Sequence, residues 1–328
     1  MLYRFGSFAA SALALASAAD AMVGAPTPGG LSLQAPATRI AERLHFFDSF
    51  LLWIITSIVV FVTALLIYVM FRYNRRANPE ARKFSHNTTI EVVWTAVPVL
   101  ILVIIALPSF TNLFYIAQEP DLEEIAQSGD FDDPNVYPAA AELGWITIKA
   151  QGNQWNWTYE YMDELDEEGY PLSFVSNPVH KGVSTDEADY IRNTGRSDFA
   201  DRPKNLATDY PMVIPVDRYI RYQTIAADVI HSWTVPAFGI KTDAIPGKLN
   251  QGWFLVEEKG VFYGQCSEIC GVNHAFMPIE VRVVSQEAYD AWVASMREGD
   301  FEGAVQIVDA ELNALATQFA DTQTLGER

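Results

Sequence analysis

Both cysteines of the chain lie in one short segment, together with a histidine and a methionine. Cys266, Cys270, His274 and Met277 fall within twelve residues. Thiolate, imidazole and thioether groups form a soft ligand set that suits copper and is used in copper sites for electron transfer. The segment therefore predicts a copper centre.

Two other chemistries must be weighed for the same cysteines. A disulfide is the ordinary fate of two neighbouring thiols in an exported protein, but it does not explain the histidine and methionine that follow. Zinc is the competing metal. Its structural sites gather two matching Cys pairs, and methionine is not among its usual ligands.

A copper site of this kind needs a second imidazole from elsewhere in the chain. We expect His231, in the run Asp228-Val-Ile-His-Ser-Trp233, to supply it from the end of an apolar strand, although a lone histidine is more often a hydrogen-bonded structural residue. A single blue-copper ion uses one thiolate. Two bridging thiolates could instead hold two copper ions, one served by His231 and the other by His274, with Met277 and a backbone carbonyl as weaker ligands.

The part of the chain that must position these residues reads as an all-β domain. From Gln118 onward, short runs rich in Val, Ile, Tyr, Trp and Phe alternate with Pro, Gly and Asn. The expected strands are Trp145–Ala150, Gln154–Tyr161, Tyr219–Ile225, Gly252–Val256, Gly260–Gly264 and Ile279–Val284. Ser176–Pro211 is polar and is expected to be a long surface insertion.

A helical segment should follow the last strand. Ser285 can cap a helix over Gln286–Arg297, and the remainder to Arg328 is expected to form a second helix or a frayed tail. One strand carries aromatic residues with period two, namely Trp155, Trp157, Tyr159 and Tyr161, which is typical of a half-buried strand that lays one face on the core.

The charge of the chain limits its partners. With 22 Lys and Arg against 41 Asp and Glu, the 328 residues carry a net charge of −19, so the chain is a poor binder of nucleic acid and basic partners are favoured. Between Glu119 and Tyr170 there are 14 acids against the single Lys149. Each acid alone is most simply part of a solvated loop, but together they could steer a basic protein.

Three apolar segments precede the β domain. Residues 1–21 combine Arg4, an Ala/Leu-rich stretch and a small-residue end at Ala19-Asp20-Ala21, which predicts a cleaved signal peptide, with an uncleaved short anchor as the alternative. Phe50–Phe71 and Val92–Phe114 have no charged residue and are each long enough to cross a bilayer. Buried core helices are the alternative, but those seldom stay apolar on every side.

The loop between the two apolar helices fixes their orientation. It holds one acid, Glu80, and five basic residues: Arg72, Arg75, Arg76, Arg82 and Lys83. By the positive-inside rule this loop faces the cytoplasm, and both flanks face out. Neither helix contains a histidine, so a redox centre must lie in the exported domain.

These residues together resemble a known family. The runs CSEICGVNHAFMP, DVIHSW, GIKTDAIPGKLNQ and GNQWNWTYEY are similar to the binuclear copper (CuA) domain of cytochrome c oxidase subunit II, and the two-helix hairpin with its basic loop fits as well. The resemblance covers most of Phe50–Val284. It implies a cupredoxin-like, Greek-key β-sandwich after a transmembrane hairpin, with a short helical C-terminal tail.

The resemblance also implies roles for single residues. Copper would be bound by His231, Cys266, Cys270, His274, Met277 and the backbone carbonyl of Glu268, and the Glu268 carboxylate would bind Mg²⁺ or Mn²⁺ at the interface with subunit I.

Roles for four further residues follow from the same resemblance. Trp155 would receive electrons, Glu160 and Asp228 would help to dock cytochrome c, and Glu91 would lie at the mouth of a proton channel into subunit I. Read without the resemblance, Glu91 is an ordinary acid near a helix N-terminus.

The expected organisation is a signal peptide at 1–21, an N-terminal segment and hairpin at 22–117, a periplasmic copper domain at 118–284 and a helical tail at 285–328. The expected function is that of subunit II in the inner membrane of a bacterium. It would accept electrons from basic cytochrome c at two copper ions and pass them to haem in subunit I, where oxygen is reduced and protons are pumped. Both termini and the copper domain would face the periplasm.

Three other classes of protein share part of this pattern. A membrane-anchored copper-delivery protein would bind one copper ion and would not need Met277 or an aromatic strand. Subunit II of a quinol oxidase shares the hairpin but lacks the copper ligands. The copper domain of a nitrous oxide reductase belongs to a soluble enzyme without such an anchor.

Overall fold

The structure is a computed structural model that describes residues 24–27, 29–80, 85–128, 137–179 and 203–326. The predicted signal peptide lies outside these residues, as does most of the predicted insertion after Ser176. Within the described part, the chain divides into a helical unit, Ile40–Pro120, and a second unit that holds the β domain.

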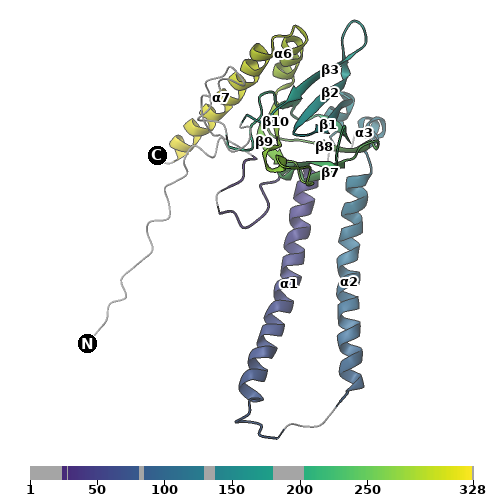
Figure 1. Cartoon of the computed structure of the whole chain (residues 1–328), viewed down its shortest axis with the longest axis vertical. Coiled ribbons are helices and arrows are strands. Elements are labelled where there is room, and N and C mark those ends of the chain that lie inside the picture. Colours follow the sequence, from purple (N-terminus) through teal and green to yellow (C-terminus); the bar gives the residue numbers. More distant parts are fainter. Residues whose placement is uncertain (1–23, 28, 81–84, 129–136, 180–202, 327–328) are drawn as a thin grey trace, which may run out of the picture. The chain divides into compact units, whose positions relative to one another are not determined.

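The helical unit consists of two long apolar helices, α1 (Arg39–Arg72) and α2 (Thr88–Ala117) (Figure 1). Both are long and apolar enough to cross a membrane. Both helices are longer than the predicted apolar segments, because flanking polar residues are also helical. The Asn87 side chain caps α2 by accepting from the Ile90 amide, while the Glu91 carboxylate accepts from the Asn87 amide, a reciprocal capping arrangement.

The β domain begins with two short helices, which corrects the prediction that the chain is all-β from Gln118. Helix α3 spans Leu122–Ser128 and α4 spans Pro138–Glu142. The Asp121 side chain accepts from the amides of Glu123 and Glu124, and a proline opens α4. Both are helix-start signals that the Trp- and Val-rich runs downstream obscured.

The strands form a five-stranded sheet in the order β3-β2-β1-β5-β8, a three-stranded sheet in the order β4-β10-β9 and the pair β6-β7. Most neighbours are antiparallel, but β1 pairs with β5, and β10 with β4, in parallel. The bounds are β1 Trp145–Asn153, β2 Asn156–Leu165, β3 Pro171–Ser176, β4 Met212–Pro215, β5 Tyr219–Ala226, β6 His231–Val235, β7 Ile240–Ala244, β8 Asn250–Leu255, β9 Gly260–Gln265 and β10 Pro278–Val284.

All six predicted strands are present as β1, β2, β5, β8, β9 and β10, whereas β3, β4, β6 and β7 were missed. The period-two prediction for β2 is confirmed from Trp157 onward. Trp157, Tyr159 and Tyr161 are fully buried and alternate with partly exposed Thr158 and Glu160. Trp155 does not belong to this strand, because β2 starts one residue later.

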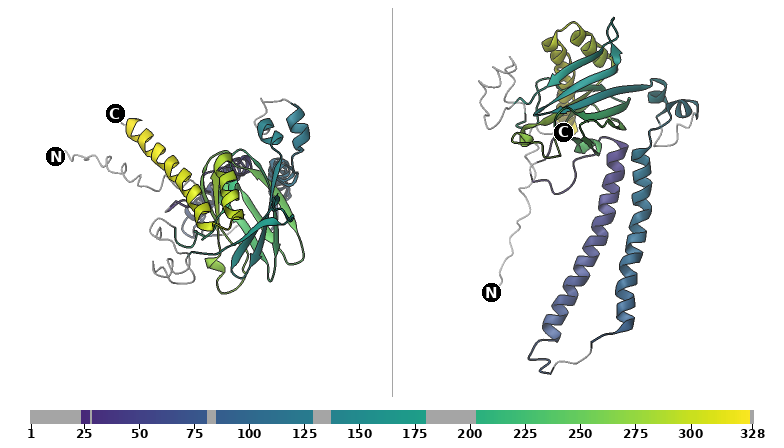
Figure 2. Two further views of the ribbon diagram at one scale, coloured as in Figure 1. Left: turned by 90° about the horizontal axis from the view of Figure 1, so that it is seen from above. Right: turned by 45° about the vertical axis from the view of Figure 1, so that its right-hand side comes forward.

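The C-terminal segment forms two helices, as expected. In α6 (Gln286–Arg297), the Ser285 side chain accepts from the Ala288 amide and so acts as the predicted cap, and α7 spans Phe301–Gly326. Figure 2 shows both helices beside the strands. Lys259 pairs with Glu311 of α7 at 2.8 Å, and Arg282 of β10 pairs with Asp309.

Strands β2 and β10 define two ends of the β domain. Each starts beside the predicted ligand segment: β2 just after Trp155, which donates to the Cys270 carbonyl, and β10 just after Met277. Each finishes near α6: Tyr161 of β2 packs on Trp292, and β10 leads directly into the Ser285 cap. We call these the metal end and the helix end.

Candidate metal centre

The predicted ligand segment is a loop that joins two antiparallel strands of one sheet. Cys266–Met277 connects β9 to β10 and contains one turn of 3₁₀ helix, His274–Phe276. The Cys266 amide donates to the Met277 carbonyl at 3.0 Å, which closes the loop. The paired strands hold the two ends of the loop together. The side chains of Cys266, Cys270, His274 and Met277 are therefore confined to a small region of the domain.

The two sulfurs lie side by side, and each faces an imidazole. The Sγ atoms of Cys266 and Cys270 are 3.8 Å apart, far longer than the roughly 2.05 Å of a disulfide bond. His231 Nδ1 lies 3.9 Å from Cys266 Sγ, and His274 Nδ1 lies 3.6 Å from Cys270 Sγ.

Two weaker donors complete the group. Met277 Sδ lies 4.0 Å from Cys270 Sγ, and the Glu268 carbonyl lies 3.3 Å from Cys266 Sγ. The structure thus brings all six predicted copper donors together. Four of their side chains are buried, namely those of His231, Cys266, Cys270 and Met277.

His231 is the one ligand that comes from outside the loop. It begins strand β6 rather than ending an apolar strand as predicted, because Asp228–Ile230 form a turn before it. Its Nε2 lies 2.9 Å from Asp228 Oδ1. A carboxylate can only accept, so the proton sits on Nε2 and the Nδ1 lone pair points at the sulfur, the arrangement that favours metal binding.

Close packing holds the His231 ring in this orientation. The buried Trp157 indole meets it edge-on, with ring centres 6.0 Å apart. On another side lies Gly152, where an added Cβ would stand only 2.8 Å from the imidazole carbons. Glycine is therefore required at position 152, since any larger side chain would displace the ring.

The two thiols differ in acidity. Burial raises the pKa of Cys266, but its hydrogen bond with His231 and its contacts with backbone groups outweigh burial and lower the pKa to about 7. Burial, and then the neighbouring Cys266, raise the pKa of Cys270 to about 12. Two adjacent thiolates repel each other, so a bound cation is needed for both to be ionised.

Burial lowers the pKa of His231, yet the contacts with Cys266 and Asp228 more than compensate and raise it overall. Burial likewise raises the pKa of Asp228, and the hydrogen bonds from His231 and two backbone amides lower it overall. Asp228 therefore stays ionised and holds the Nε2 proton of His231, as expected for a carboxylate that orients a ligating histidine.

Trp155 lies in the turn between β1 and β2, partly exposed, and touches the ligand loop directly. Its Nε1 donates to the Cys270 carbonyl at 3.2 Å. The neighbouring Gln154 donates to the same carbonyl through Nε2 at 2.7 Å. Gln154 was not predicted as a site residue; in the sequence its only signal is its place beside the tryptophan in an aromatic segment.

The two predicted docking acids both have partners. Asp228 Oδ1 accepts from His231 and Val229, and its Oδ2 accepts from the Gln154 amide at 2.7 Å. Glu160 pairs with Lys149 across β1 and β2 at 2.6 Å. Both side chains remain partly exposed, with 34% for Asp228 and 21% for Glu160.

The densest acidic run lies at the helix end. Residues 163–168 span the last residues of β2 and the turn after it, which at about 3.3 Å per residue lie roughly 30 Å from Trp155. Several of these acids are used locally: Asp163 accepts from the Thr147 amide, and Glu164 pairs with Arg297 at 2.9 Å. Near the copper donors, this run can act only through its long-range field.

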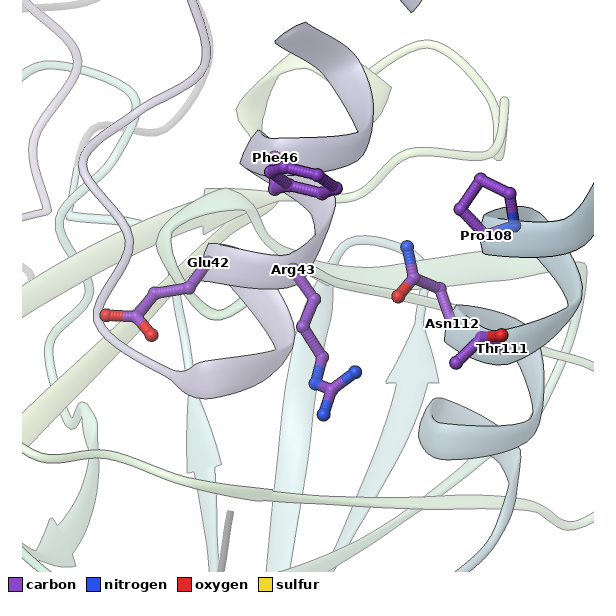
Figure 3. A pocket seen from close by; sticks show the side chains of 6 residues that line it. All are labelled: Glu42, Arg43, Phe46, Pro108, Thr111 and Asn112. Atoms are coloured by element: carbon purple, nitrogen blue, oxygen red, sulfur yellow. The ribbon is translucent and has the colours of Figure 1, made fainter. Parts of the chain in front are cut away.

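The described part of the helical unit contains hollows along both helices. One lies along the first turns of α2 beside Glu91, Thr95 and Val99. Another lies between α1 and α2, and Figure 3 shows side chains of both helices around it; its lining residues are Glu42, Arg43, Phe46, Pro108, Thr111 and Asn112. The Arg43 guanidinium lies 3.9 Å above the Tyr115 ring. None of the lining residues is a cysteine or histidine.

The donor set fits copper. Paired thiols, two imidazole nitrogens and a thioether converge in a mostly buried site, whereas zinc would gain nothing from the methionine. For Mg²⁺, the exposed Glu268 offers one carboxylate, and this ion is often held by one or two carboxylates with waters.

Comparison with known proteins agrees with this site. Residues 26–112 match the transmembrane domain of cytochrome c oxidase subunit II, and residues 146–284 match its periplasmic domain. The chain is 39% identical to cytochrome c oxidase subunit 2 of Cereibacter sphaeroides over 300 residues, 90% of each chain. It is 40% identical to that of Cyanidium caldarium over 82% of this chain and 91% of the other.

A solved structure is similar as well. The crystal structure of the periplasmic domain of subunit II of cytochrome oxidase of Bradyrhizobium japonicum shares 42% identity and covers 47% of this chain and 94% of its own, with a TM-score of 0.39. The family models that match both the hairpin and the β domain, together with the Cereibacter sphaeroides relative, lead to one conclusion: this chain belongs to the cytochrome c oxidase subunit II family, with a histidine, cysteine and methionine cluster consistent with its CuA copper site.

Proposed function

We propose that this subunit accepts electrons from reduced cytochrome c at a binuclear copper centre and passes them to haem in subunit I, where oxygen is reduced and protons are pumped. The observation that carries the proposal is the pair of thiols 3.8 Å apart, each with an imidazole Nδ1 beside it. A mononuclear blue-copper site uses one thiolate, and a zinc site with two thiolates and two imidazoles would leave the converging Met277 thioether without a role.

Six donors would hold the copper: His231, Cys266, Cys270, His274, Met277 and the Glu268 carbonyl. When bound, a copper pair supplies one-electron transfer with little rearrangement. The chain's part is to exclude water and to keep the donors fixed. Burial of both cysteines and Met277, and the Asp228 carboxylate behind His231, serve these two purposes.

Trp155 would be the residue through which electrons arrive. It is partly exposed, and its indole nitrogen donates to the carbonyl of a copper-ligating cysteine. The exposed part of the ring can therefore meet a partner, while the indole N–H at its edge joins it to the ligand loop by a hydrogen bond.

A basic cytochrome c would dock on the metal end. Both Glu160 and Asp228 are partly exposed acids. Glu160 follows Trp155 closely in sequence, and Asp228 accepts from the amide of Gln154, the residue before Trp155. The overall charge of −19 also favours a basic partner. The acids of residues 163–168 would attract cytochrome c over a long range but would not contact it in the docked complex.

The remaining roles concern subunit I and the membrane. The Glu268 carboxylate would bind Mg²⁺ or Mn²⁺ shared with subunit I, and Glu91, in the first turn of α2, would admit protons from the cytoplasmic side. The basic loop between α1 and α2 supports a bacterial inner-membrane orientation with both termini and the copper domain in the periplasm. The proposed domain bounds are those of the sequence prediction, with signal cleavage after residue 21.

Rapid mixing of the complete oxidase with reduced cytochrome c tests the proposal. Cytochrome c absorbance should show transfer of electrons to the wild-type enzyme, and a His231→Ala oxidase should lose this phase even though its haem in subunit I is intact. Equal rates in both enzymes would show that electrons bypass this subunit.

A further inference from the structure

The turn that carries Trp155 is tied to both halves of the copper site by one residue, Gln154. Its side-chain Nε2 donates to the Cys270 carbonyl at 2.7 Å, the same oxygen that accepts from Trp155 Nε1. Its backbone amide donates to Asp228 Oδ2 at 2.7 Å, and the other oxygen of that carboxylate accepts from His231. Gln154 thus links a ligand on the loop to a ligand on β6.

The ligand loop leaves room for this contact at Gly271. An added Cβ there would lie 3.0 Å from Gln154 Nε2 and 3.1 Å from the Trp155 ring, and the glycine has a φ of +121°. Side chains at this position would be both strained and crowded. The amide and the indole therefore rest directly on the loop backbone, next to Cys270.

Two hydrogen bonds to one carbonyl restrict the turn more than either does alone. Without the Gln154 amide, the turn would depend on the longer Trp155 bond and on the backbone bond to Asp228. The Gln154 side chain itself contacts no copper-donor atom; its acceptor is a carbonyl outside the predicted donor set. Its removal should loosen the position of Trp155 and leave the donors in place.

We propose that Gln154 is a positioning residue for electron uptake: its amide fixes the Trp155 turn against the Cys270 carbonyl, so that the indole keeps one distance to the copper ligands. This inference rests on the proposed function, in which Trp155 receives the electrons. Asp228 is the second anchor of the same turn, in addition to any part that it has in docking.

The test compares three forms of the complete oxidase: wild type, Gln154→Met and a matched control, Gln223→Met. Methionine keeps the length of glutamine but cannot donate. Gln223 also uses its amide in one side-chain bond, to Gln251 at 2.9 Å, between β5 and β8. Hydrogen–deuterium exchange followed by mass spectrometry reports opening of residues 154–156, and steady-state kinetics with cytochrome c give kcat and KM separately.

In Gln154→Met, the amides of residues 154–156 should exchange about fivefold faster, the ratio that corresponds to one net hydrogen bond. The kcat should fall by a similar factor, while KM stays within about twofold and copper content is unchanged. Gln223→Met should match wild type in all four quantities.

Three outcomes would overturn the inference. Unchanged exchange or unchanged kcat would remove the positioning role. A raised KM at normal kcat would make Gln154 a docking contact, and loss of copper would make it a support of the metal site. Failure of the proposed function would be seen separately, as a wild-type oxidase without paired copper or a Trp155→Phe enzyme with normal kcat.

Discussion

The two ends of the β domain are held together by different interactions, although the same strands run through both. At the metal end, hydrogen bonds to carbonyls and one carboxylate fix the residues, and Gly152 and Gly271 allow rings to approach the backbone closely. At the helix end, aromatic rings pack against one another, with Tyr161 and Trp292 centred 5.2 Å apart and tilted by 51°, and Arg282 is buried between acids.

In this domain the residues for function lie at the metal end, and much of the stabilising packing lies at the helix end. At the metal end, bringing donor atoms such as two adjacent thiols together costs free energy in the absence of a metal ion, and a bound metal ion would offset that cost. The helix end contributes large buried rings, which dominate core energetics. Substitutions at the metal end should therefore change electron transfer more than folding, and those at the helix end should do the reverse.

The largest effect is expected at the metal end, from Cys270→Ser. A hydroxyl cannot replace a bridging thiolate for copper, so the oxidase should lose copper and at least about 100-fold in electron uptake, more than removal of an outer-shell partner costs. Metal analysis and cytochrome c oxidation measure both. Circular dichroism should show a folded protein, and normal turnover in this variant would remove Cys270 from the site.

At the helix end, Arg282→Met should act on stability alone. Arg282 is 3% exposed and bonds both Glu280, at 2.9 Å, and Asp309. Its loss leaves the Glu280 charge buried and poorly compensated, which typically costs about 3–5 kcal/mol. Thermal unfolding of the purified protein should show this loss, with copper content unchanged at low temperature.

Arg297→Met is the matched control for that change. Arg297 pairs with Glu164 at the same end, but its side chain is 38% exposed, so its removal should cost at most about 1 kcal/mol. Equal destabilisation by both substitutions would mean that burial does not set the strength of these ion pairs.

A smaller effect is expected from Trp155→Phe. The ring remains, but the hydrogen bond to the Cys270 carbonyl is lost, and oxidation of cytochrome c should slow about tenfold, equivalent to about 1.4 kcal/mol on the barrier. Copper content should stay constant. Trp145→Phe, at the start of β1 and beside Tyr219, is the control and should leave the rate unchanged; a normal rate in both variants would exclude Trp155 from the path.

The smallest effect is expected from the acidic run at the helix end. Replacing exposed Glu167 and Glu168 by Gln should raise KM for cytochrome c by less than about twofold at physiological salt, because roughly 30 Å is several screening lengths of about 8 Å. Glu160→Gln should raise KM more, and higher ionic strength should raise it in every form. A greater effect from the distant pair would place the docking surface at the helix end.

Much of this organisation could be predicted from local patterns. Uninterrupted apolar runs indicate the hairpin helices, and alternation marks β2, because both signals depend on neighbours in sequence. The short strands β4, β6 and β7 were missed, since four or five residues show too little alternation. Asp121 and Pro138 are start signals for α3 and α4, but the β-rich composition of the following residues favoured the prediction of strands.

The copper donors were predicted because four of the five side-chain donors share one loop. His231 could be proposed only as the second imidazole that the site needs and as part of a family resemblance. The contacts of Gln154 and Asp228 could not be predicted, because they join segments more than 70 residues apart in sequence. Such contacts depend on tertiary packing and cannot be predicted from the spacing of residues in the sequence.

The decisive measurement is the copper content and absorption spectrum of the mature, full-length subunit in its complex. We expect two copper ions per chain and the purple spectrum of a mixed-valence pair. A single copper ion per chain, or a Cys266–Cys270 disulfide in the working enzyme, would contradict it.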